Sequence, residues 1–86
     1  MERKFNTAIE ARRVTDELRL QLGTINFNKD LFKYLHNIEK MVSILSSAEV
    51  RARQSHKPSL VDKPRDNLAN ALDYLEKMII IAKLSE

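Results

Sequence analysis

The chain has 86 residues, with 15 Lys and Arg against 12 Asp and Glu, and a formal net charge of +3. Its composition, 43% hydrophobic and 31% charged with one glycine and two prolines, is typical of a globular helical protein and argues against disorder. The sequence contains no cysteine, which excludes disulfides, thiolate zinc sites and thiol nucleophiles.

The length and the hydropathy pattern predict a small protein without a membrane span. We expect one domain, residues 1–86, because a chain of this length has room for a single core. The N-terminal residues lack the apolar stretch of a signal peptide, and the longest strongly apolar run, 78–82, is too short to span a bilayer. Because a cysteine-free chain suits a reducing compartment, we expect a cytoplasmic protein without a targeting segment.

Gly23, Pro58 and Pro64 divide the sequence into three stretches with helical periodicity. The predicted helices cover about residues 2 or 7 to 22, 29 to 53 and 64 to 84, and a polar linker covers 54–63. The connection at 23–28 is short enough to make the first two helices antiparallel neighbours. The sequence therefore predicts an all-α fold, an antiparallel up-down-up three-helix bundle. The alternative is a helical hairpin with a separate arm, completed by dimerisation.

The first predicted helix has a weak apolar face. Its members share a three-four spacing: Ala8, Ala11, Thr15, Leu18 and Leu22. Phe5, Ile9 and Leu20 fall off this face, so we expect the helix to contact neighbours on two sides. Thr7 and Glu10 fit a capping box, in which each side chain binds the other residue's backbone N–H. With Thr7 as the cap, residues 1–6 are predicted to be a frayed lead-in.

The second predicted helix is the most clearly amphipathic, and Asn28 is its expected N-cap. Its apolar residues fall within one broad arc: Leu31, Tyr34, Leu35, Ile38, Met41, Val42, Leu45 and Ala48. Ile44 and Val50 lie outside this arc. Before this helix, Ile25 and Phe27 are predicted to cap the end of the bundle. After it, Leu60 and Val61 are expected to pin the linker onto the core.

The third predicted helix begins near Pro64, which suits a first-turn position because its missing N–H costs nothing there. Its main face comprises Leu68, Ala71, Leu72, Leu75, Met78, Ile79 and Ala82. Ile80 and Ile81 point away from this face, about 100° apart, and Tyr74 shares the flank of Ile81. The run at 78–82 is thus more apolar than one buried face requires.

Two explanations of this surplus are open. The segment docks into a partner or a second copy of the chain, or the first helix covers it within the monomer through Phe5, Ile9 and Leu20. The first explanation predicts that aspartate at Ile80 or Ile81 weakens the assembly, because burying one isoleucine contributes about 1.5 to 3 kcal/mol. The residues predicted to form the protein interface are Tyr74, Ile80, Ile81, Leu84 and Ile44.

The net positive charge is concentrated in residues 51–66, which hold five Lys or Arg against two Asp or Glu. The residues that form a candidate contact for anions or nucleic acid are Arg51, Arg53, Lys57, Lys63 and Arg65. No aromatic residue accompanies these cations for base stacking, and the long connections do not resemble a helix-turn-helix. The pattern therefore argues against nucleic acid as a partner.

The sequence offers little catalytic or metal-binding chemistry. His36 and His56 follow no recurring ligand spacing, so we expect exposed side chains and no metal site. No Gly-rich phosphate loop or paired acid motif is present, and Ser43, Ser46 and Ser47 lie in a predicted helix without a context that would activate them. We expect no enzymatic activity and no cofactor.

Three functions are compatible with this pattern. The leading hypothesis is a non-catalytic protein–protein interaction module, such as an adaptor, a small chaperone or an assembly subunit, that uses the apolar patch on the third helix. The second is a nucleic-acid-binding or regulatory protein that uses residues 51–65. The third is a homodimeric structural bundle closed through the third helix.

Overall fold

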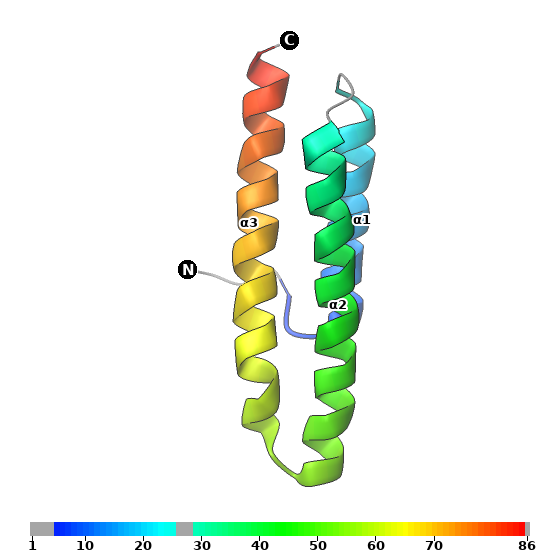
Figure 1. Ribbon diagram of the computed structural model, residues 1–86, viewed down its shortest axis with the longest axis vertical. Helices are drawn as coiled ribbons and strands as arrows, with labels where there is room; N and C mark the ends of the chain where they lie inside the picture. Colours follow the sequence, from blue (N-terminus) through cyan, green and yellow to red (C-terminus); the bar gives the residue numbers. More distant parts are fainter. Residues whose placement is uncertain (1–4, 26–28, 86) are drawn as a thin grey trace.

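The predicted all-α three-helix bundle is confirmed by the computed structural model, which describes residues 5–25 and 29–85 (Figure 1). The described elements are α1 (Ala8–Gly23), α2 (Lys29–Ser55), the short 3-10 helix η1 (Pro58–Val61) and α3 (Asp62–Leu84). The three α-helices run up, down and up along a body of 49 × 22 × 17 Å. Because α1 contacts both α2 and α3, it is part of the bundle and not a separate arm.

The apolar face predicted for α1 is buried throughout. Its four apolar residues lie in one core cluster with the apolar residues of α2 and α3. Thr15 is the polar member, with 2% of its surface exposed, and its hydroxyl donates a hydrogen bond of 2.8 Å to the carbonyl of Ala11. Because this bond satisfies the hydroxyl within the helix, the core contains the threonine without an unpaired polar group.

In the apolar arcs predicted for α2 and α3, the central residues are buried and the residues at one edge are only partly buried. The fully buried residues of the two helices are Leu31, Leu35, Ile38, Val42, Leu45, Ala48, Ala52, Leu68, Ala71, Leu72, Leu75 and Ile79. Tyr34, Met41 and Met78, which share the predicted arcs, are half-buried and pack against the core from its edge. The buried stripe is therefore narrower than the arc of apolar residues in the sequence.

The start of α1 is held by two side chains. The backbone N–H of Glu10 donates to the Thr7 hydroxyl at 3.3 Å, and that hydroxyl donates to the Glu10 carboxylate at 3.2 Å. Of the two hydrogen bonds of the predicted capping box, the one from the Glu10 N–H to the Thr7 hydroxyl is present. The second bond joins the Thr7 hydroxyl to the Glu10 carboxylate. The predicted N-cap of α2, Asn28, and the predicted end cap Phe27 lie outside the described residues, whereas Ile25 is half-buried against the core.

Glu49 of α2 also binds the start of α1. Its carboxylate Oε2 accepts a hydrogen bond of 3.0 Å from the backbone N–H of Ala8, where the positive end of the helix dipole favours an anion. Along α2 the three-four spacing runs from Leu45 through Glu49 to Ala52, so a partly buried carboxylate takes a position that would otherwise hold an apolar residue. This contact sets the level on α2 at which α1 begins.

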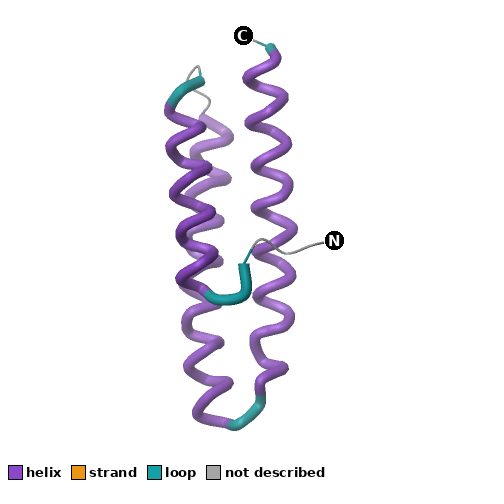
Figure 2. Tube along the Cα trace, turned by 180° about the vertical axis from the view of Figure 1, so that it is seen from behind, coloured by secondary structure: helices purple, strands orange, loops and turns teal. Residues whose placement is uncertain are grey.

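The prediction of a frayed lead-in is wrong for Phe5, which is 2% exposed. Residues 5–7 turn from the lower end of α1 towards α3, and α2 and α3 continue below that end (Figures 1 and 2). Phe5 belongs to the same core cluster as the buried residues of α2, η1 and α3. An aromatic ring from the segment before the helix therefore adds apolar volume to the core of the bundle.

The predicted linker at 54–63 is shorter in the structure, because α2 continues to Ser55 and α3 begins at Asp62. His56 ends α2 in the left-handed conformation, with φ 56°, and the N–H of Lys57 donates to the carbonyl of Ala52 at 3.0 Å. This is the hydrogen bond of a Schellman motif, whose left-handed residue is usually glycine. In η1, Val61 is buried as expected, whereas Leu60 is exposed.

We expect Phe5→Ala to lower the free energy of unfolding by about 3 to 5 kcal/mol, because it removes a buried ring and leaves a cavity. Ile9→Ala is the matched control, since Ile9 is 71% exposed and its truncation should change stability by about 0.5 kcal/mol or less. Urea unfolding followed by circular dichroism measures both. Equal losses in the two variants would contradict the structural role of Phe5.

We expect His56→Gly to raise the free energy of unfolding by about 0.5 to 1 kcal/mol, because glycine adopts positive φ without the steric cost of a Cβ. Ser55→Gly, one residue earlier and still helical, should lower it by a similar amount. Thermal or urea unfolding of the two variants gives shifts of opposite sign if the left-handed conformation is correct. A destabilised His56→Gly variant would argue against it.

Candidate protein-interaction face

The residues predicted to form a protein interface are exposed, and α1 does not cover them. Ile80 and Ile81 on α3 are 51% and 54% exposed. The residues expected to cover them lie elsewhere: Ile9 and Leu20 are themselves exposed, and Phe5 is buried in the core. Covering of this segment within the monomer, one of the two explanations of its apolar surplus, is therefore wrong for the described part of the chain.

The five predicted residues do not share one surface. At about 100° per residue, Ile81 lies within about 20° of Tyr74, whereas Ile80 lies on the opposite flank of α3 and Leu84 points away from the core. Figure 1 shows the C-terminal end of α3, which holds Ile80, Ile81 and Leu84, extending beyond the first turn of α2. Adjacency in the sequence thus grouped side chains that the helix separates.

The structure instead joins Tyr74 of α3 to side chains of α2. Its ring lies 5.1 Å from the ring of Tyr34, centroid to centroid, with the planes tilted by 56°. Further down the same groove, Met41 and Ile44 of α2 line an open depression of about 170 Å³ together with residues of the first turns of α3. Tyr74 and Ile44, predicted from separate helices, therefore fall on one surface.

We name this surface the α2–α3 face. Its residues are Tyr34, Met41, Ile44, Pro64, Asn67, Tyr74, Met78 and Ile81. Sequence reasoning assigned Tyr34, Met41 and Met78 to the core and gave Asn67 no role. A seven-residue spacing along one flank, 34 and 41 on α2 and 67, 74 and 81 on α3, is the signal in the sequence that could have identified the face.

The centre of the α2–α3 face is uncharged at neutral pH. Burial raises the pKa of the Tyr34 hydroxyl above its ordinary value of 10.0, and the neighbouring Tyr74 adds to the rise. The Tyr34 phenol therefore stays protonated well above neutral pH. A tyrosine buries its ring against a partner while its hydroxyl keeps a hydrogen bond, which is why this residue type is enriched in interfaces.

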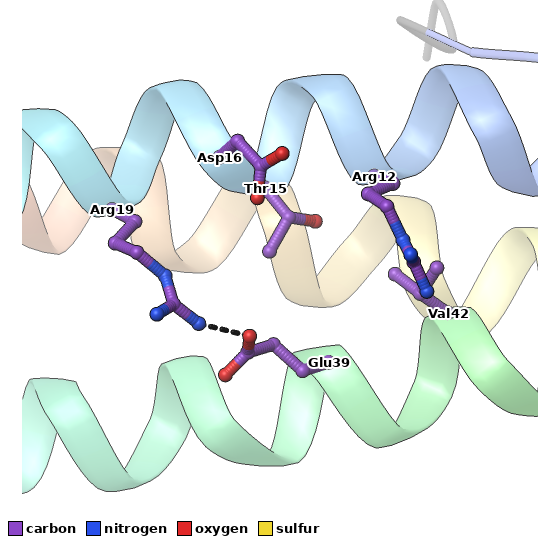
Figure 3. Close-up of a pocket in the computed structure, with 6 residues that line it drawn as sticks. All are labelled: Arg12, Thr15, Asp16, Arg19, Glu39 and Val42. Carbon is purple, nitrogen blue, oxygen red and sulfur yellow. Dashed lines mark hydrogen bonds and ion pairs between the residues drawn. The ribbon is translucent and has the colours of Figure 1, made fainter.

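A second groove lies between α1 and α2 on the other flank of α2 (Figure 3). Its lining residues are Arg12, Thr15, Asp16, Arg19, Glu39 and Val42. Arg19 forms an ion pair with Glu39 across the groove, and Thr15 already donates to the backbone. The two cations and two carboxylates balance each other, and exposed pairs of this kind contribute about 0 to 1 kcal/mol. We therefore assign this groove to helix packing.

The structure separates the basic residues predicted to contact anions. Lys63 lines the depression of the α2–α3 face, and Arg51 lies on the same side of α2 by its position in the helix. Arg53 lies on the opposite flank of α2, towards α1. Arg65 is half-buried, with its Nε buried and without a hydrogen-bond partner among the described residues. The cations therefore do not form one phosphate-binding surface.

The two histidines lie apart on α2. His36 is exposed, with its Nδ1 3.9 Å from a carboxylate oxygen of Glu39, and His56 forms the end of the helix. Within residues 5–25 and 29–85, no group of three or more His, Asp or Glu residues is arranged to hold a metal ion. None of the helices described there combines the length and the apolarity needed to cross a bilayer.

Neither a protein-family model, nor a curated protein, nor a solved structure matches the chain.

Proposed function

We propose that the protein is a non-catalytic protein-interaction module that binds a partner protein through the α2–α3 face. The observation that best supports this proposal is that Ile44 and Tyr74, about half exposed, lie on one apolar surface with a depression at its lower end. Singly exposed apolar residues are normal on protein surfaces, whereas a contiguous set along two helices is typical of an interaction site.

The residue types on this face also favour binding of a protein. Tyrosine and methionine are enriched at the cores of interfaces, and methionine side chains adapt to an irregular partner surface. The half-buried side chains of Tyr34, Met41 and Met78 are packed against the core before binding, and the exposed ring of Tyr74 lies against Tyr34. Little side-chain entropy is then lost on association, which favours affinity. An adaptor, a small chaperone or an assembly subunit in the cytoplasm would use such a surface.

Ile44→Asp is expected to lower retention of the partner by about tenfold or more while the helical content is unchanged. Loss of one buried isoleucine removes about 1.5 to 3 kcal/mol of binding free energy, and a desolvated carboxylate adds a further cost. The immobilised protein and its variant are compared for capture of proteins from an extract of the source cells. Circular dichroism checks that both variants fold.

Leu20→Asp is the matched control, because Leu20 is 74% exposed on the outer side of α1. It introduces the same charge and removes a similar apolar area, yet it should retain every protein that the wild type captures. Equal capture by Ile44→Asp and the wild type would refute the proposed function. So would equal loss in Ile44→Asp and Leu20→Asp, because the loss would then not depend on the α2–α3 face.

A further inference from the structure

Basic side chains border the α2–α3 face along both helices. At about 100° per residue, the outer edge of the face carries exposed cations on α2 and on α3. These residues are Lys33, Lys40, Arg51, Lys63 and Lys77. Lys63 lines the depression itself, and Lys77 lies one turn beyond Tyr74. Basic residues thus lie along both edges of the α2–α3 face, and on the α3 edge Lys77 is paired with Asp73.

Two carboxylates of α2 lie away from these borders, whereas Asp73 of α3 lies beside one border cation. Glu39 pairs with Arg19, and Glu49 binds the N–H of Ala8, both on the α1 side of α2. Asp73, on the outer side of α3, lies 3.1 Å from the Nζ of Lys77. Asp30, in the first turn of α2, is the acidic residue nearest the upper end of the face.

Four of the bordering cations carry uncompensated charge. Within the described part of the chain, the side chains of Lys33, Lys40, Arg51 and Lys63 make no ion pair. A ligand whose own charges meet these four would gain electrostatic attraction at both edges at once.

We propose that the partner presents an amphipathic helix whose apolar stripe lies in the groove of the α2–α3 face and whose flanks carry Asp and Glu. This inference rests on the proposed function and names the chemistry of the partner. A helix in an apolar groove is a recurring recognition mode, read through anchors at i, i+3, i+4 and i+7. Along α3 the α2–α3 face is roughly 27 Å long from Lys63 to Ile81, which is the length of a helix of about 18 residues.

Charge disfavours a second copy of the chain as the occupant. In a two-fold dimer formed through this face, the lysines and arginines of one copy would face those of the other. Like charges across an interface cost several kcal/mol and suppress that pairing. An acidic helix meets the same borders with favourable charge.

Shape disfavours a membrane surface as the occupant. A helix that lies in a bilayer interface inserts a convex apolar face into the acyl region. Here Tyr34, Met41 and Met78 are half-buried between two helices, and the apolar surface deepens to a depression beside Ile44. A narrow ligand can enter this groove, whereas a flat lipid surface would contact mainly its basic borders.

Both tyrosines of the chain, Tyr34 and Tyr74, lie on this face, and the chain has no tryptophan. Intrinsic tyrosine fluorescence therefore reports on the α2–α3 face alone. The probes are two synthetic peptides of about 18 residues without aromatic side chains. They share one leucine stripe at helical spacing, and one carries glutamate on both flanks where the other carries lysine. We expect the acidic peptide to bind about tenfold tighter or more, with an affinity that falls as salt is raised.

Reversal of the border charge tests whether the cations select the partner. In the double variant Lys40→Glu with Lys63→Glu, the charges at the four uncompensated positions sum to zero, so the preference for the acidic peptide should be largely lost. Lys83→Glu is the matched control, because Lys83 is exposed on the opposite flank of α3 and should leave the preference for the acidic peptide unchanged. Circular dichroism and light scattering confirm that each variant folds as a particle of the wild-type mass.

Each of the following results would contradict the inference. Equal affinity for the two peptides, or a preference unaltered by the charge reversal, would remove the role of the borders. Failure of both peptides to bind would exclude a helix in the groove. A doubled mass that Ile44→Asp abolishes would assign the face to a second copy, and tighter binding to phosphatidylserine vesicles than to the acidic peptide would assign it to lipid. The proposed function fails separately, if Ile44→Asp leaves capture of the partner unchanged.

Discussion

The hydrogen bond between the Ala8 N–H and the Glu49 carboxylate sets the arrangement on which the rest of the bundle depends. It starts α1 opposite a point well inside α2, so that α2 and α3 continue past the lower end of α1 (Figure 1). The chain places an acidic residue in a buried stripe in order to meet the positive end of a neighbouring helix. Phe5, in the segment just before α1, is buried in the core cluster that the three helices share.

The same arrangement distinguishes the two flanks of α2. On one flank α1 lies beside α2, and the groove between the two helices is lined by charged side chains that balance each other. On the other flank only α3 is present, and the apolar arc of α2 is wider than the stripe that α3 buries. Tyr34, Met41 and Ile44 are the apolar residues of α2 that α3 does not bury fully. They lie beside Tyr74 and the first turns of α3. The apolar surface is therefore exposed because α1 packs on one flank of α2 and α3 alone packs on the other.

Helical periodicity was sufficient to predict the three helices and most of the buried residues, because each helix buries a stripe that repeats every three or four positions. It failed for Phe5, whose burial depends on an extended segment that turns back across the hairpin. It also failed to group Ile44 with Tyr74, because the pairing of two helices depends on their register and not on either pattern alone. Conversely, Ile80 and Ile81 looked like one patch only because they are neighbours in the chain.

The burial of Phe5 also bears on the order in which the chain folds. It lies in one core cluster with residues of α2, η1 and α3, and the hydrogen bond just after it, between Ala8 and Glu49, spans 41 positions of sequence. Such a contact closes a long loop and gains little until the hairpin of α2 and α3 has formed, because the site for the ring does not exist before then. Phe5 should therefore dock after the main folding barrier, and its docking should slow unfolding far more than it speeds folding. Among the described residues, the first buried one to be synthesised is thus the last to reach its place.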